Sequence, residues 1–180
     1  MTPLLANAGI PMLFPQAILM GLALFPVTII ETFVVCRSSG LPKGKALLDV
    51  GLANLNSTIF GVPLAWGLMF GLALLTGRGF AWDTDCPIQM LAAVTLESAW
   101  LPPHYDQLFW MFPAAATALL IPCFLASVLI EHWYLARCWK SLDRREVFGA
   151  VLRANLWSYL ALFSVGCSWF LMNVQRYTKS

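Results

Sequence analysis

Four long apolar stretches limit what this chain can fold into, because each is long enough to cross a lipid bilayer as a helix. They cover residues 11–35, 47–76, 108–136 and 154–174, and a helix needs about 20 mostly apolar residues to span about 30 Å of hydrocarbon. Apolar residues make up 59% of the chain and charged residues 11%, whereas soluble domains carry about 45–50% and about 25%. The sequence therefore predicts an all-α integral membrane protein with four transmembrane helices.

Two parts of the sequence about one hundred residues apart resemble each other. An Ile-Glu pair stands at 30–31 and again at 130–131, each followed six residues later by an arginine. An Ala-Asn-Leu segment occurs at 53–55 and at 154–156, and a Phe-Pro pair at 14–15 and at 112–113. Matches in the same order at a nearly constant offset indicate an internal duplication. We expect a first helical hairpin in residues 1–76 and a second in residues 108–180, joined by the loop 77–107.

Basic residues gather in the two short loops between the helices of each predicted hairpin. The positive-inside rule places such loops in the cytoplasm. Both termini and the 77–107 loop would then lie outside, in a membrane of the inner or plasma type. Because the two hairpins have the same orientation, the predicted duplication is parallel and not inverted. The basic residues concerned are Arg37, Lys43, Lys45, Arg137, Lys140, Arg144, Arg145 and Arg153.

The central loop contains a shorter apolar stretch. It runs from Ile88 to Trp100, is broken by a few polar residues, and is followed by Pro102-Pro103. This stretch is too short to span a membrane. We expect a short interfacial helix here on the outer side, with a re-entrant helix as the alternative.

Two glutamates within predicted spans are the main polar candidates. Glu31 and Glu131 each precede by six residues the arginine that marks the end of the span, which is about 9 Å of helix. A charge at that depth is costly, so each acid should face the bundle and be paired or protonated. Asn54 and Asn155 lie early in the return helices, where a hairpin would bring each beside its glutamate. Arg153 has no counterpart in the first repeat and would pair with Glu131 if it reached it, which would separate the pKa values of the two acids.

Three interpretations of these pairs remain open. Each Glu–Asn pair is a buried hydrogen bond that locks one hairpin, part of a polar site between the repeats for a proton, a cation or a polar ligand, or a contact with a partner subunit.

Small residues recur at four-residue spacing along the predicted helices. Such rows let helix backbones approach closely in lipid. They predict tight packing inside the bundle, with a dimer face as the alternative. The candidates are Gly21, Gly67, Gly71, Ala114 and Ala118.

No catalytic or metal-binding constellation is visible. The sequence has two histidines, His104 and His132, and five cysteines without a C-x-x-C pair, which do not form a credible metal or disulfide set. The motifs of common hydrolases and nucleotide-binding enzymes are also missing. No cofactor is predicted, bound lipid is expected, and the basic residues suit topology and anionic lipid better than nucleic acid.

Three functions follow from these observations. The first is a non-catalytic integral membrane subunit, or an assembly and stabilising partner of a larger membrane complex, associated with other integral subunits or with a second copy. The second is a small transporter or channel with a Glu/Asn polar site. The third is a membrane-embedded enzyme acting on a lipid-soluble substrate, with a glutamate as general acid or base.

Overall fold

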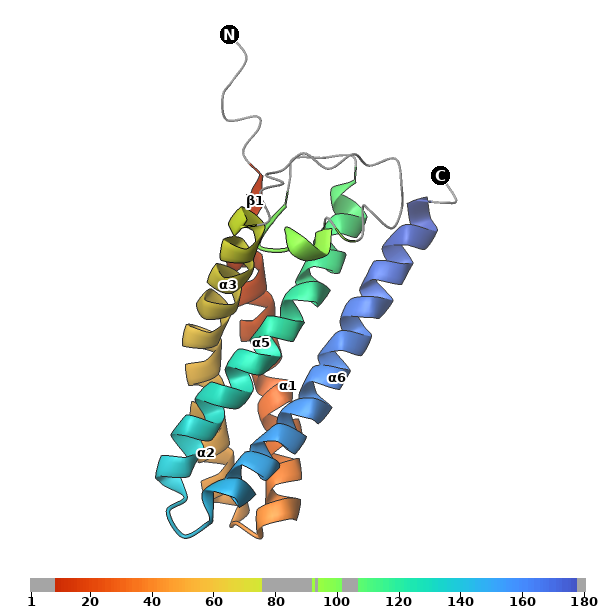
Figure 1. Cartoon of the computed structure of the whole chain (residues 1–180). Coiled ribbons are helices and arrows are strands. Elements are labelled where there is room, and N and C mark those ends of the chain that lie inside the picture. Colours follow the sequence, from red (N-terminus) through yellow and green to blue (C-terminus); the bar gives the residue numbers. More distant parts are fainter. Residues whose placement is uncertain (1–8, 76–91, 93, 102–106, 178–180) are drawn as a thin grey trace.

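The computed structural model describes residues 9–75, 92, 94–101 and 107–177 as a bundle of long helices (Figure 1). The elements are β1 (Ile10–Pro11), α1 (Leu13–Ser39), α2 (Lys43–Asn56), the π-helical segment η2 (Ser57–Gly61), α3 (Val62–Leu75), β2 (Trp100–Leu101), α5 (Leu108–Cys138) and α6 (Arg144–Tyr177). Because α2, η2 and α3 run on without a break, the described residues contain four helices that are long and apolar enough to cross a membrane. The predicted all-α class is confirmed, and the four predicted spans correspond to helices that could cross a membrane.

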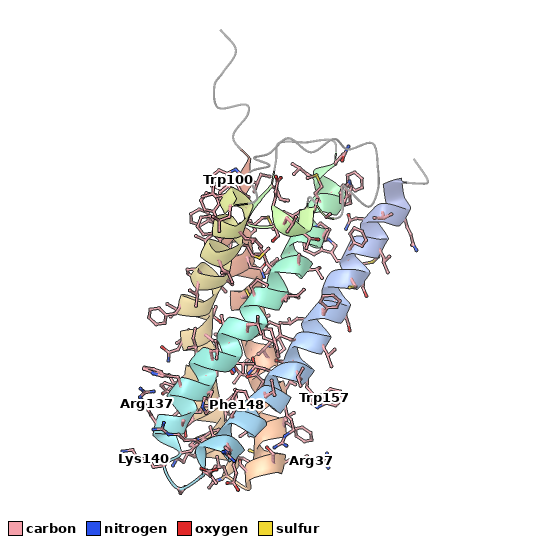
Figure 2. All side chains as sticks on the ribbon, viewed as in Figure 1. Arg37, Trp100, Arg137, Lys140, Phe148 and Trp157 are labelled. Atoms are coloured by element: carbon pink, nitrogen blue, oxygen red, sulfur yellow. The ribbon has the colours of Figure 1, made fainter. Side chains whose placement is uncertain are left out.

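The helices extend beyond the predicted apolar limits at one end of the bundle. The second span begins at Lys43 and the fourth at Arg144, whereas hydropathy placed their starts at 47 and 154. Hydropathy detects the part of a helix that suits hydrocarbon, and charged residues can continue the helix beyond it. Two short turns, residues 40–42 and 139–143, close this end, which we call the basic end. Arg37, Arg137 and Lys140 all lie there (Figure 2).

Local sequence explains where the helices meet these turns. Gly40 has a φ of 65° and its N–H donates to the Cys36 carbonyl, the usual left-handed end of a helix. Pro42 then directly precedes α2. At the second turn the Trp139 N–H donates to the Leu135 carbonyl at 2.8 Å and α5 ends.

The second span widens for one turn at its middle. Residues 57–61 form a π-helical turn, and Pro63 follows directly. Proline has no N–H to donate to the carbonyl four residues earlier, so a wider turn accommodates it. The corresponding part of α6 is a regular helix. Pro26, Pro113 and Pro122 lie inside continuous helices.

The two hairpins pack against each other through two pairs of helices. Within the hairpins α1 contacts α2, and α5 contacts α6; between them α1 contacts α6, and α5 contacts α2, η2 and α3. Three apolar clusters fill the interior. One lies at the basic end around Val35, Leu135 and Trp139, one in the middle around Met20, Leu120 and Tyr159, and one at the opposite end around Met12, Leu101 and Leu119.

The opposite end is covered by the segment that precedes α5. β1 pairs with β2 in antiparallel register, and the Met12 N–H donates to the Ala99 carbonyl. Residues 94–96 are helical, but Glu97, Ser98 and Ala99 form a buried turn. The end of the predicted interfacial helix therefore packs inward onto the bundle and does not lie on its surface. Most of residues 77–93 fall outside the described part of the chain, so the remainder of that helix stays a prediction.

Candidate functional site

Each glutamate lies beside the asparagine of its own hairpin. Asn54 Nδ2 donates to Glu31 Oε2 at 2.5 Å, and Asn155 Nδ2 donates to Glu131 Oε2 at 2.7 Å. The fold thus brings together the two pairs that the sequence singled out. Each hairpin turn sets α1 or α5 beside its return helix, which places acid and amide at the same depth.

Two serines complete the set, and they cross between the hairpins. Ser158 Oγ of the second hairpin donates to Glu31 Oε1 at 2.6 Å. Ser57 Oγ of the first donates to Glu131 Oε1 at 2.8 Å. Each acid therefore has an amide donor from its own hairpin and a hydroxyl from the other. We call the six residues the glutamate cluster: Glu31, Asn54, Ser57, Glu131, Asn155 and Ser158.

The serines were missed as site residues, although a signal for them exists. Asn and Ser stand three residues apart in both repeats, at 54 and 57 and at 155 and 158. Residues three apart lie on the same face of a helix. A repeated Asn-x-x-Ser opposite a repeated glutamate therefore marks a shared polar face. Which glutamate each serine would contact depends on how the hairpins pack, which spacing alone does not reveal.

The asparagine amides are held in place by their own helices. The Nδ2 group of Asn54 also donates to the Val50 carbonyl, and that of Asn155 to the Val151 carbonyl, at 3.1 and 3.2 Å. Both amide protons are then used, one on the backbone four residues earlier and one on the acid. This arrangement fixes the orientation of each amide before the acid is bound.

The cluster is buried between apolar layers. Glu31 is 1% exposed and Glu131 2%, with the apolar cluster of the basic end on one side and the middle cluster on the other. A buried polar group without a partner costs about 1–3 kcal/mol. The four bonds between acids and donors therefore stabilise the packing of both hairpins.

The number of serine protons limits which hydrogen bonds the glutamate cluster can form at once. Ser57 Oγ also lies 3.0 Å from the Asn54 carbonyl, and Ser158 Oγ 3.1 Å from the Asn155 carbonyl. A hydroxyl has one proton and cannot donate to both neighbours. Both contacts of each serine are satisfied together if the glutamate is neutral and donates its proton to the serine. The serine hydroxyl then donates to the backbone carbonyl of the asparagine three residues earlier. The arrangement thus accommodates one proton on each glutamate without rearrangement.

Arg153 does not join the cluster. It is exposed, and no ion pair with Glu131 occurs within the described ranges. Two residues along a helix turn the side chain by about 200°, so Arg153 faces away when Asn155 faces Glu131. The condition under which Arg153 would distinguish the two acids is therefore not met, and each acid has one amide and one hydroxyl partner.

Further polar side chains lie between the cluster and the opposite end. Ser127 and Tyr159 are hydrogen-bonded through their hydroxyls at 2.8 Å, and Cys123 lies near Gln16. Cys123, Ser127 and Glu131 stand four residues apart and share one face of α5. A discontinuous row of polar groups thus runs from Gln16 toward the glutamates.

The predicted packing glycines do not contact the rest of the chain. A Cβ at Gly21, Gly67 or Gly71 would meet nothing within 4 Å, and Ala114 and Ala118 are half-buried. Close approaches between one helix and another occur at two other glycines. A Cβ at Gly61 would lie 3.4 Å from Ala126 Cβ, and one at Gly166 would lie 2.5 Å from Thr117 Oγ1. Packing inside the bundle was therefore assigned to the wrong glycines.

Metal binding finds no geometric support in the described ranges. They hold no group of three or more His, Cys, Asp or Glu side chains suited to a metal ion. The ring of His132 packs edge-on against Phe148 with centroids 5.3 Å apart, and His104 lies outside the described residues.

The chain matches no protein-family model, no curated protein and no solved structure. Its class therefore rests on its own features. It is an all-α protein with four helices that are long and apolar enough to cross a membrane, with a buried glutamate cluster between its two hairpins.

Proposed function

We propose that this protein is a non-catalytic integral membrane subunit, or an assembly partner, of a larger membrane complex. The observation that carries the proposal is the closed state of the glutamate cluster. All four carboxyl oxygens have a hydrogen-bond partner from within the chain. Three pockets formed by described residues lie along the helices, and neither glutamate lines any of them. Acids whose oxygens are all hydrogen-bonded within the chain suit a structural lock better than a reaction centre.

An outward glycine pair on α3 supports association with another membrane helix. Gly67 and Gly71 form a G-x-x-x-G pair with open space around both, and Leu64, Leu68 and Leu72 beside them are exposed. Such pairs let two helix backbones approach closely in lipid. The partner would be a helix of another integral subunit or of a second copy of this chain.

We also propose the orientation and the origin of the fold. The basic end lies in the cytoplasm, and both termini with the 77–107 loop lie outside, because arginine and lysine concentrate in the helix ends that flank the two short turns. The hairpins derive from a parallel duplication, which is supported by the repeated Glu, Asn and Ser and by their matching hydrogen bonds.

The test is purification of the tagged full chain from its native membrane in mild detergent, followed by a native gel and mass spectrometry. We expect a larger band with defined companions or a dimer. Gly67→Leu with Gly71→Leu should abolish that band, because leucine blocks close approach. Val165→Leu on α6 is the matched control, since Val165 is also exposed. A wild-type chain that runs as a lone monomer, or a band that survives both leucines, would contradict the proposal.

A second candidate function is a small transporter for protons or another small cation. It is favoured by one unpartnered atom: Asn155 Oδ1 is buried without a hydrogen bond, although the same amide binds Glu131. The polar row that includes Ser127 and Tyr159 lies on the side of the cluster toward the opposite end.

Proteoliposomes with an imposed pH gradient test this second function. A transporter should dissipate the gradient in the wild type and lose that activity in Glu31→Gln or Glu131→Gln. Glu146→Gln is the control, because Glu146 is exposed near the basic end. If the wild type passes no protons and no Na⁺ or K⁺, the transporter function is excluded and the subunit function is unaffected.

A further inference from the structure

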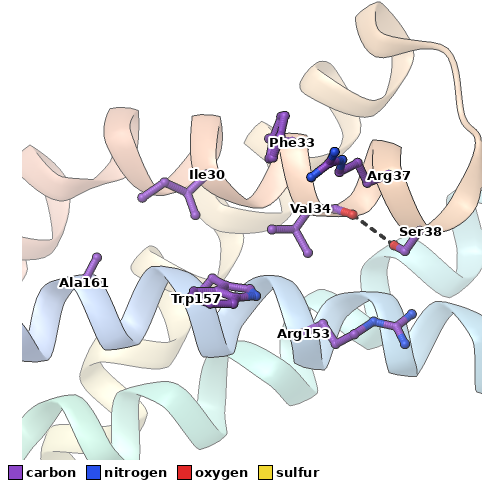
Figure 3. Close-up of a pocket in the computed structure, with 8 residues that line it drawn as sticks. All are labelled: Ile30, Phe33, Val34, Arg37, Ser38, Arg153, Trp157 and Ala161. Atoms are coloured by element: carbon purple, nitrogen blue, oxygen red, sulfur yellow. Dashed lines mark hydrogen bonds between the residues drawn. The ribbon is translucent and has the colours of Figure 1, made fainter.

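A groove with a basic rim lies between α1 and α6 near the basic end (Figure 3). Its volume is about 610 Å³. Apolar side chains from both helices form its wall, and Arg37 of α1 and Arg153 of α6 stand on its two sides toward the basic end. The lining residues are Ile30, Phe33, Val34, Arg37, Ser38, Arg153, Trp157 and Ala161.

The two arginines are available to a ligand. Both are exposed, and in the described part of the chain neither forms an ion pair. Arg37 has only a cation–π contact, with its guanidinium 5.2 Å from the centre of the Phe33 ring. Ser38 is already committed, because its hydroxyl donates to the Val34 carbonyl. The groove therefore presents two free positive charges at its rim above an apolar wall.

The glutamate cluster holds the two walls of this groove together. Ile30 precedes Glu31 and Trp157 precedes Ser158, and Glu31 is bonded to Ser158 at 2.6 Å. This bond ties α1 to α6 directly beneath the groove. A buried contact thus joins the two helices that carry Arg37 and Arg153.

The equivalent interface, where α5 packs against α2, does not repeat this arrangement. Arg137 corresponds to Arg37, but its Nη1 donates to the Trp133 carbonyl at 2.7 Å and its guanidinium lies 3.7 Å from the centre of the Trp133 ring. Arg153 corresponds to Leu52 in the first repeat. The matching position between α5 and α2 therefore has one arginine, which is already occupied.

We propose that the groove between α1 and α6 binds one anionic phospholipid. The phosphate lies between Arg37 and Arg153, and an acyl chain follows Ile30, Val34 and Ala161 away from the basic end. Guanidinium groups bind phosphate through paired, charge-assisted hydrogen bonds. Basic pockets between membrane helices on the cytoplasmic side suit anionic head groups. A protein helix would not need two unpaired charges at the hydrocarbon boundary.

The experiment is native mass spectrometry of the full chain in detergent with added phosphatidylglycerol or phosphatidylcholine. We expect one tightly bound phosphatidylglycerol and much weaker phosphatidylcholine. Arg37→Gln with Arg153→Gln should weaken phosphatidylglycerol binding by about tenfold or more. Arg137→Gln is the matched control, because it removes the equivalent charge from the other hairpin and should leave binding unchanged.

Two further experiments distinguish binding of a whole phospholipid from binding of a free phosphate. Trp157→Ala, which opens the apolar wall, should weaken lipid binding without changing either arginine, and excess inorganic phosphate should not displace the lipid. Equal binding of both lipids, or an equal loss in Arg137→Gln and in the double variant, would overturn the proposal. Displacement by free phosphate would also overturn it, since the acyl chain would then contribute nothing.

Discussion

The two hairpins use the same buried polar residues but differ in how much of their surface the chain covers. In the most apolar part of α5, 61% of residues are buried, against 17% in the most apolar part of the helix Lys43–Leu75. The hydrogen bonds from asparagine and serine to each glutamate nevertheless match in both hairpins. The two hairpins thus share their buried polar contacts and differ in their outer faces. The first hairpin exposes the outward glycine pair, and the second supplies Arg153 at the groove between α1 and α6.

Measuring the protonation state of Glu31 and Glu131 is the most decisive test of whether the two hairpins are equivalent. We expect both glutamates to be neutral at neutral pH, because the serine contacts are then all satisfied. Infrared spectroscopy should detect a protonated carboxyl band that falls by about half in Glu31→Gln or Glu131→Gln and disappears in the double variant. Glu146→Gln should leave the band unchanged. Loss of the whole band in one single variant would show that the hairpins are not equivalent.

Removing the amide donors should have the next largest effect. Asn54→Leu and Asn155→Leu each remove one donor to a buried acid and add bulk to a packed interior, so each should lower stability by about 3 kcal/mol. Thermal unfolding in detergent, followed by circular dichroism, measures the change. Asn173→Leu is the control, because that half-buried asparagine bonds only to the Trp169 carbonyl. A large loss at one cluster position alone would contradict the symmetry.

The serine contacts sharpen the comparison, because they link one hairpin to the other. Ser57→Ala and Ser158→Ala should each cost about 1 kcal/mol. In double-mutant cycles Ser57 should couple with Glu131 and Ser158 with Glu31, whereas Ser57 with Glu31 should be additive. Coupling of each serine to the acid of its own hairpin would contradict the crossed arrangement.

Glycine substitutions should give the smallest effects, and their signs should differ. Gly67→Ala should raise stability by about 0.5–1 kcal/mol, since alanine is the better helix former and nothing lies within 4 Å. Gly166→Ala should lower it by about 1 kcal/mol, because the new methyl group meets Thr117 Oγ1. Thermal unfolding of the monomer in detergent measures both. If both substitutions changed the stability in the same direction, the packing of α5 against α6 would differ from the one described.

Sequence reasoning reached the Glu–Asn pairs because the distances involved are short along the chain. A hairpin places residues 31 and 54 at one depth whatever its neighbours do. Sequence reasoning failed at Arg153 and at the packing glycines for the same reason. Both depend on which face of a helix turns inward, and a helix that is apolar all round gives no such signal.

The amino-acid sequence by itself determined the all-α class, the four spans and the candidate acids with their amides. These properties follow from hydrophobic length and from contacts within one hairpin. Only the tertiary structure decided that Ser57 reaches Glu131, that Ser158 reaches Glu31, and that Arg37 and Arg153 stand on one groove. Those contacts join residues far apart in the chain, and they exist because the packing of α1 against α6 and of η2 against α5 fixes the rotation of each helix about its own axis.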